Sequence, residues 1–212
     1  MLSTNGLTYQ YPNSTLIQFP DLEVEEGHAL IVYGESGCGK TTLLHLLGGL
    51  LQPRSGQINI DQTTLSEMSN SRRDEFRGQN IGIVYQQFYF IESLSIRDNL
   101  RISPFSKNHD RTHKIIERLG LEESASKYPH QLSVGQKQRA CIARAVTNSP
   151  KLILADEPTS NLDNKNCSTV IDLLMEEAYW NDAALVIVTH DDRLRSEIND
   201  CIDLTELSKV QN

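Results

Sequence analysis

Residues 34–42 read Gly34-Glu35-Ser36-Gly37-Cys38-Gly39-Lys40-Thr41-Thr42. They match the phosphate-binding pattern G-x-x-x-x-G-K-[ST] at every fixed position, a pattern that is specific only between a strand and a helix. The apolar residues 29–33 are typical of a buried parallel strand, and the leucine-rich residues 40–47 predict a helix that ends near Gly48. These flanks favour a nucleotide-binding loop over a glycine-rich turn that only precedes a core helix.

The chemistry of such a loop assigns a role to its residues. Its glycines let backbone N–H groups surround phosphate oxygens, and the positive end of the following helix points at the same anion. We expect every residue from Gly34 to Thr42 to contribute, with Lys40 reaching the β- and γ-phosphates and the Thr41 hydroxyl ligating Mg²⁺. Cys38 is expected to be a small side chain that fits a crowded loop; in the alternative, the helix terminus would favour its thiolate and make it redox-sensitive.

Composition limits the possible classes of protein. The 212 residues carry a formal charge of −8, which argues against broad binding to nucleic acid or to an anionic membrane surface. The longest apolar runs, such as residues 184–188, fall short of the roughly 20 residues of a membrane-spanning helix. Residues 1–6 lack the features of a signal peptide. The spacing of the four cysteines matches neither a metal site nor a disulfide framework. A cytosolic protein is therefore expected.

The order of apolar and amphipathic segments predicts an α/β fold with one phosphate-loop ATPase domain over residues 1–212. Apolar strands are expected at 29–33, 81–85, 151–155 and 184–188, with helices between them, as in a mostly parallel sheet covered on both faces. Residues of about 1–30 and 55–62 predict an antiparallel β part, and about 88–145 a helical subdomain. The tail after Asp191 is mixed and charged, with no predicted element.

A second chemical cluster follows the strand at 151–155. Asp156 and Glu157 leave its carboxyl end, where ligands bind in open α/β sheets. Asp156 is therefore expected to hold Mg²⁺, and Glu157 to orient or deprotonate the water that attacks the γ-phosphate. The alternative, a pair of turn acids before Pro158, is weak beside a complete phosphate loop. His190 ends the strand at 184–188 in the same way, and this position makes it a candidate site residue.

Residues 132–139 read Leu132-Ser133-Val134-Gly135-Gln136-Lys137-Gln138-Arg139. This stretch resembles LSGGQ, the signature of ABC-type ATPases, with Val134 in place of the first glycine. With it, about residues 7–191 resemble the nucleotide-binding subunit of an ABC transporter. Ser133 and Gln136 also fit a helix capping box with free N–H groups. The ordinary interpretation is a helix cap; the resemblance implies that Ser133, Gly135 and Gln136 grip the γ-phosphate bound to a second copy.

The resemblance assigns the remaining motifs residue by residue. Tyr11 matches the aromatic residue that stacks on adenine, and residues 154–157 match the Walker B motif with its catalytic glutamate. Gln86 matches the glutamine that touches metal and water and faces the membrane subunit. Residues 160–163, including Asn161 and Asp163, match the D-loop near the nucleotide, and His190 matches the switch histidine. Catalytic roles are thus implied for Glu157, His190, Gln86 and Lys40.

The function implied by the resemblance is that of an ATPase with Mg²⁺ that dimerises head to tail around two ATP molecules. Its dimer would drive integral-membrane permease subunits from the cytoplasmic face. The apolar side chains of residues 87–100 would contact these subunits or, in the alternative, pack in the core of the helical subdomain. Residues 71–77 and 128–131 are similar to the ATPases of lipoprotein-releasing and macrolide-exporting systems. The alternative is a cell-division type of ABC ATPase, which regulates an extracytoplasmic enzyme through a membrane partner. A DNA-repair type would need a long coiled coil, and residues 87–132 are too few.

Overall fold

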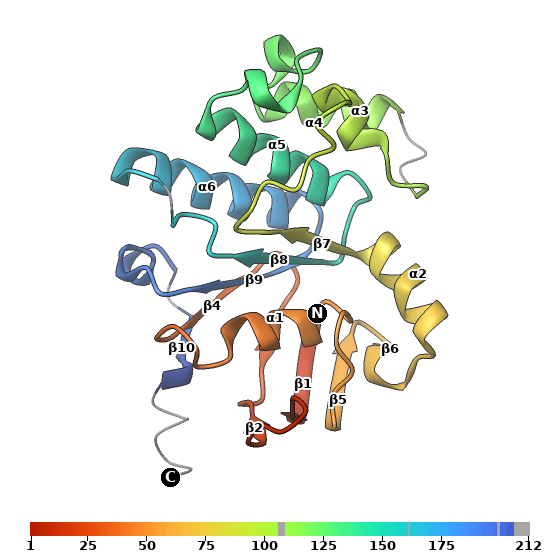
Figure 1. Cartoon of the computed structure of the whole chain (residues 1–212), viewed down its shortest axis with the longest axis vertical. Helices are drawn as coiled ribbons and strands as arrows, with labels where there is room; N and C mark the ends of the chain where they lie inside the picture. The colour runs from red at the N-terminus through yellow and green to blue at the C-terminus, as the bar shows by residue number, and fades with distance from the viewer. Residues whose placement is uncertain (106–108, 161, 199, 206–212) are drawn as a thin grey trace.

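The computed structural model describes residues 1–105, 109–160, 162–198 and 200–205 of the chain (Figure 1). Its central sheet is parallel and has the order β10-β4-β9-β8-β7. The strands are β4 (Ala29–Tyr33), β7 (Ile81–Val84), β8 (Leu152–Asp156), β9 (Ala184–Thr189) and β10 (Cys201–Asp203). Every residue of β9 is buried, because helices or strands cover both faces of this sheet.

The second sheet is antiparallel and is built around β1 (Leu2–Tyr9). β1 pairs with β2 (Ile17–Gln18), β3 (Glu23–Val24) and β5 (Ser55–Ile60), and β5 pairs with β6 (Thr63–Thr64). The register of β1 and β5 shifts between Asn5 and Thr8. Gly56 faces this irregularity with φ +92°, and a Cβ atom there would lie 2.4 Å from the carbonyl oxygen of Gly6. Only glycine fits this close approach of two strands.

Helix α1 (Lys40–Leu47) lies between the two sheets (Figure 1). Its leucines at 43, 44, 46 and 47 are fully buried in one cluster with residues of β1, β5, β8 and β9. Burial of each leucine side chain contributes roughly 1.5–3 kcal/mol, so the helix joins the sheets into one core. The start of α1, and the loop that precedes it, are thereby held against the carboxyl edge of the parallel sheet.

The opposite face of the parallel sheet is covered by α5 (Val134–Val146) and α6 (Asn164–Trp180). Beyond α5 lie α3 (Ile96–Arg101) and α4 (His109–Arg118), while α2 (Asn70–Asn80) leads into the edge strand β7 (Figure 1). Short 3₁₀ turns occur at Leu65–Glu67, Glu122–Ser124, Pro129–Gln131 and Asp192–Ser196. In the described residues, no helix is both long enough and apolar enough to cross a membrane.

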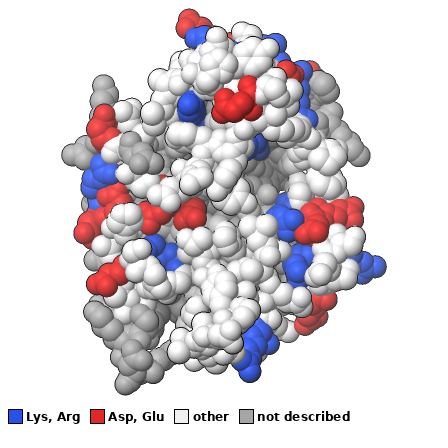
Figure 2. Space-filling view, viewed as in Figure 1, with Lys and Arg blue, Asp and Glu red and all other residues white. Residues whose placement is uncertain are grey.

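The predicted α/β fold class is confirmed, including the antiparallel β part and the helices between β7 and α5. The sequence pattern missed β10, which pairs in parallel with β4 at the sheet edge. Its residues Cys201, Ile202 and Asp203 alternate in polarity and form no apolar run, because an edge strand is covered less than an inner one. On the face shown in Figure 2, basic side chains are interspersed with acidic ones rather than gathered into one broad patch.

Candidate functional site

A cavity of about 670 Å³ opens at the carboxyl edge of the parallel sheet. This volume lies within the range of small-molecule sites, roughly 300–1,000 Å³. The predicted site residues that line it are Glu35, Ser36, Gly37, Gly39, Lys40, Thr41, Thr42, Gln86, Asp156, Glu157 and His190. Tyr33, at the end of β4, lines it as well. Strand order explains the gathering, since β4, β9 and β8 are neighbours and each ends at this edge.

The loop before α1 holds its lysine close to its own backbone. Lys40 is buried, and its Nζ donates hydrogen bonds to the carbonyl oxygens of Gly34 (2.7 Å) and Glu35 (3.0 Å). Gly39 precedes the helix with φ +105°, a conformation that L side chains rarely adopt. The loop therefore curls around the lysine head, which stays at the start of α1 where the helix dipole is positive.

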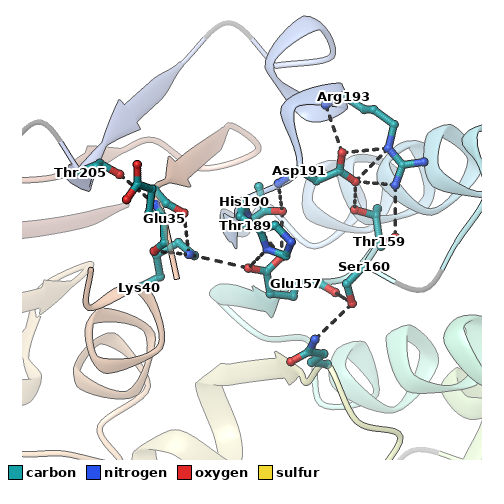
Figure 3. A network of polar contacts seen from close by, with 12 residues as sticks. Glu35, Lys40, Glu157, Thr159, Ser160, Thr189, His190, Asp191, Arg193 and Thr205 are labelled. Atoms are coloured by element: carbon teal, nitrogen blue, oxygen red, sulfur yellow. Dashed lines mark hydrogen bonds and ion pairs between the residues drawn. The ribbon is translucent and has the colours of Figure 1, made fainter. Parts of the chain in front are cut away.

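Several neighbouring groups hold the side chain of Glu157 in the cavity (Figure 3). Its Oε1 accepts a hydrogen bond from His190 Nδ1 (2.7 Å), and its Oε2 accepts from Thr189 Oγ1 (3.1 Å) and His190 N (3.3 Å). Lys40 Nζ lies 3.8 Å from Glu157 Oε1. The backbone of Glu157 has φ +48°, which a non-glycine residue holds only when its surroundings impose it. The carboxylate is thus fixed by contacts to β9 and α1.

Asp156 lies next to Glu157 but in a different environment. Burial raises the pKa of its carboxyl group, and the neighbouring charge of Glu157 adds to the rise, while His45, Lys40 and a hydrogen bond with the Thr41 side chain oppose it. The described residues contain no group of three His, Cys, Asp or Glu side chains that could hold a metal ion. Mg²⁺ commonly binds one or two carboxylates together with substrate phosphates and water. The Asp156 and Thr41 oxygens fit that kind of site.

Gln86 connects the end of β7 to the end of β8. Its Nε2 donates to Ser160 Oγ (3.3 Å), and Ser160 Oγ donates to the carbonyl oxygen of Glu157 (3.1 Å). The Gln86 side chain therefore lines the cavity on the side opposite the phosphate loop's strand, with β8 and β9 between them. Two hydrogen bonds through Ser160 thus link Gln86 to the backbone of Glu157.

Two residues of the phosphate loop do not line the cavity. A Cβ atom at Gly34 would lie 2.5 Å from Cys38 Sγ, so these residues pack against each other. Burial raises the pKa of the Cys38 thiol above its ordinary value and outweighs the opposing effect of Lys40. The alternative of a favoured Cys38 thiolate is therefore wrong. The interpretation as a small residue in a crowded loop fits the contact.

Tyr11 lies beside the loop without lining the cavity. Its hydroxyl is 3.1 Å from Thr42 Oγ1, and its ring contacts Tyr9 edge to face, with centroids 4.8 Å apart. The side chain is exposed, at 40 % of its full accessibility. An exposed aromatic ring is therefore held next to the helix that follows the phosphate loop.

The signature residues lie apart from this cavity. Gln136 N–H donates to Ser133 Oγ (3.3 Å), and Ser133 N–H donates to Gln136 Oε1 (3.0 Å), so the predicted capping box forms. Val134 is half exposed, and a Cβ atom at Gly135 would have no atom of the described residues within 4 Å. The fold of a single chain therefore does not require glycine at position 135.

The predicted D-loop is described only in part. Asn161 lies outside the described residues. Asp163 does not line the cavity: its Oδ1 accepts from Asn166 N (2.9 Å), which caps α6. The sequence interpretation assigned no role to two residues that support the site. Thr189 adjoins His190 and could be found from its strand-end position, whereas Thr205, whose Oγ1 accepts from Glu35 N (2.9 Å), gives no local signal.

Comparison with known proteins identifies related chains. The family model described as ABC transporter matches residues 18–160. The lipoprotein-releasing system ATP-binding protein LolD of Shewanella sp. (strain MR-7) is 39 % identical over 185 residues, which cover 84 % of this chain and 80 % of that protein. LolD 1 of Rhodopirellula baltica is 34 % identical and covers 100 % of this chain and 96 % of its own length.

Solved structures match over nearly the whole chain. A dimeric structure of the bacterial ABC transporter cassette MJ0796 has a TM-score of 0.84 at 30 % identity, covering 97 % of this chain and 95 % of its own. The same cassette is known as a dimer in a post-hydrolysis state bound to ADP and Pi, with a TM-score of 0.83.

Proposed function

The chain belongs to the ABC transporter family as an ATP-hydrolysing cassette, and on this premise we propose which of its residues bind ATP and carry out hydrolysis. Residues 34–42 bind the phosphates, with Lys40 neutralising the β- and γ-phosphates. Tyr11 contacts the adenine, which its exposed ring beside Thr42 supports. Because Lys40 Nζ bonds to the loop's own carbonyl oxygens, the incoming phosphate oxygens would compete for a donor that is already in place.

Glu157 is the general base of this proposal. It accepts a proton from water as the water oxygen bonds to the γ-phosphorus, and the bond from phosphorus to the bridging oxygen of ADP breaks. The supporting observation is that Glu157 lines the cavity and that His190 and Thr189 hold its carboxylate in one orientation there. A positioned base of this kind contributes about 10²–10⁴-fold to a rate.

Asp156, Thr41 and Gln86 are proposed to hold Mg²⁺ at the carboxyl end of β8. The bound ion would neutralise charge on the phosphate oxygens. The contact between Asp156 and Thr41 supports this role, because the pair presents two hard oxygen donors beside the phosphate loop.

A second copy of the chain would complete each ATP site. Ser133, Gly135 and Gln136 lie outside the cavity of their own chain. The free N–H groups at the N-terminus of α5 lie beside these residues and could bind an anion. The open space beside Gly135 permits close approach of another molecule. The dimeric structure of the related cassette MJ0796 supports pairing of two copies, and the head-to-tail arrangement is part of our proposal. Asp163, in the D-loop, is proposed to adjoin the nucleotide only in that dimer.

The proposed partners are integral-membrane permease subunits, which the dimer would meet at the cytoplasmic face of a membrane. Residues 87–100 are suited to docking because the apolar side chains of Tyr89 and Ile91 are exposed and available to a partner. Ile96 is buried and anchors the same segment in the core. The similarity to LolD proteins favours lipoprotein release or a related export process over the cell-division type of regulation.

Glu157→Gln tests the assignment of the base. The variant should bind ATP, lose turnover by at least about 10²-fold, and accumulate as an ATP-dependent dimer, because the amide cannot take the proton. Phosphate release and analytical ultracentrifugation measure the two effects. Glu123→Gln, in an exposed 3₁₀ turn, is the matched control and should behave as the wild type. Wild-type turnover in Glu157→Gln would exclude Glu157 as the base.

A further inference from the structure

The side chain of Arg193 joins two loops that leave neighbouring strands of the parallel sheet (Figure 3). Arg193 lies in the 3₁₀ turn after β9, and it reaches the loop after β8. Its Nη1 donates to the carbonyl oxygen of Leu162 (3.2 Å), and its Nη2 donates to that of Thr159 (3.4 Å). The Arg193 guanidinium therefore binds the backbone of the loop that begins at the proposed base, Glu157.

The same guanidinium holds Asp191 through a two-point ion pair. Arg193 Nε donates to Asp191 Oδ1 (2.8 Å) and Nη2 donates to Oδ2 (2.6 Å). Asp191 Oδ2 also accepts from the hydroxyl of Thr159 (2.9 Å), a fully buried residue. A planar guanidinium can serve a carboxylate and backbone carbonyl oxygens at once, whereas an ammonium group cannot span them.

A continuous path of contacts leads from this ion pair to the cavity. The N–H of Asp191 donates to Thr189 Oγ1 (3.0 Å), and the Thr189 hydroxyl donates to Glu157 Oε2 (3.1 Å). Asp191 and Thr189 are thus joined by a hydrogen bond, and the two residues flank His190. Arg193 consequently contacts both the loop that follows Glu157 and the turn that follows His190.

We propose that Arg193 is a positioning residue for ATP hydrolysis, which keeps Glu157 and His190 in their reactive arrangement by holding the two loops together. The proposal rests on the role of Glu157 proposed above. The backbone of Glu157 supports it, because φ +48° needs surrounding contacts to persist, and Arg193 supplies contacts to Thr159 and Leu162 just beyond. Arg193 itself does not touch the reacting atoms.

Steady-state hydrolysis by Arg193→Lys and Arg193→Ala tests the proposal. Lysine keeps a positive charge opposite Asp191 but cannot reach both loop carbonyls. We expect kcat to fall about 5–10-fold in Arg193→Lys and about 10–100-fold in Arg193→Ala, with KM for ATP within about twofold of the wild type. Assays are run below the thermal transition of each variant. Arg72→Ala, an exposed arginine of α2, is the control for lost charge and should be unchanged.

A wild-type kcat in Arg193→Lys overturns the proposal, as does an effect confined to KM. If Arg193→Ala does not fold, the kcat of Arg193→Lys decides alone, because its ion pair with Asp191 is kept. Glu157→Gln is measured in parallel to separate two failures. An inactive Glu157→Gln beside fully active Arg193 variants excludes only the positioning role, whereas an active Glu157→Gln excludes the base itself.

Discussion

His190 Nδ1 lies 2.7 Å from Glu157 Oε1, although the two residues are 33 positions apart in the chain. The contact forms because β8 and β9 are parallel neighbours, with Asp156 opposite Val188, so that both strands end side by side. A carboxylate only accepts, so the histidine donates through Nδ1–H. The imidazole therefore holds one oxygen of the proposed base in a fixed direction.

Removal of the His190 imidazole should lower the rate of ATP hydrolysis more than the affinity for ATP. In His190→Ala, we expect kcat to fall by about 10²-fold while KM for ATP stays within a few fold, because Glu157 loses its orientation but the phosphate loop is intact. Steady-state phosphate release measures both constants. His28→Ala, an exposed histidine before β4, is the matched control. An unchanged kcat would show that the contact is dispensable.

A bulky charge at the start of α5 should prevent dimer closure. Ser133→Arg places a cation where a second copy would approach, and it also removes the cap hydroxyl that accepts from Gln136 N–H. In the Glu157→Gln background, the ATP-dependent dimer should disappear while binding of a fluorescent ATP analogue to the monomer remains. Ser71→Arg, on the exposed side of α2, controls for the added charge. A normal dimer in Ser133→Arg would contradict the role in a second copy.

Acid should weaken the fold through Asp191. The hydrogen bonds from Arg193 lower the pKa of this carboxyl group to about 2, below the ordinary value of 3.8. Because the folded pKa is lower than the unfolded one, the contribution is complete above pH of about 4 and is lost as the pH falls toward 2. Its size is roughly 1–2 kcal/mol after allowance for partial exposure of the ion pair.

Asp191→Asn should therefore lower the free energy of unfolding at neutral pH and flatten its decline below pH of about 4. Urea denaturation at several pH values measures both effects. The control is Asp172→Asn, which changes an exposed aspartate of α6. An undiminished acid dependence in Asp191→Asn would mean that other carboxyl groups cause it.

Cys38 should react slowly with thiol reagents despite its place in the phosphate loop. Burial raises its pKa, which lowers the thiolate fraction at neutral pH, whereas Cys201 is exposed. With iodoacetamide at pH 7.5, we expect Cys201 to be modified about 10-fold faster than Cys38. Peptide mass mapping over time measures both rates, and Cys201→Ser confirms the assignment. Faster modification of Cys38 would restore the alternative of a favoured thiolate.

Much of the site could be predicted because its signals are local or follow from strand ends. The loop at 34–42 and the acids after residue 155 each follow an apolar run, so the sequence predicts that they lie at the carboxyl edge of the sheet. β10 and Thr205 could not be found in this way. Thr205 lies 170 positions from Glu35, to which it bonds, and no residue near it in the chain indicates that contact.

The sequence by itself determined the features that arise within a few residues. The capping box of Ser133 and Gln136 joins residues three apart, and the phosphate loop curls through its own glycines. Only the tertiary structure decided which strand ends meet, that Arg193 links two loops, and that the Cys38 thiol is protonated more readily. Strand order and burial depend on contacts between elements that are far apart in the chain. A local sequence pattern therefore cannot predict them.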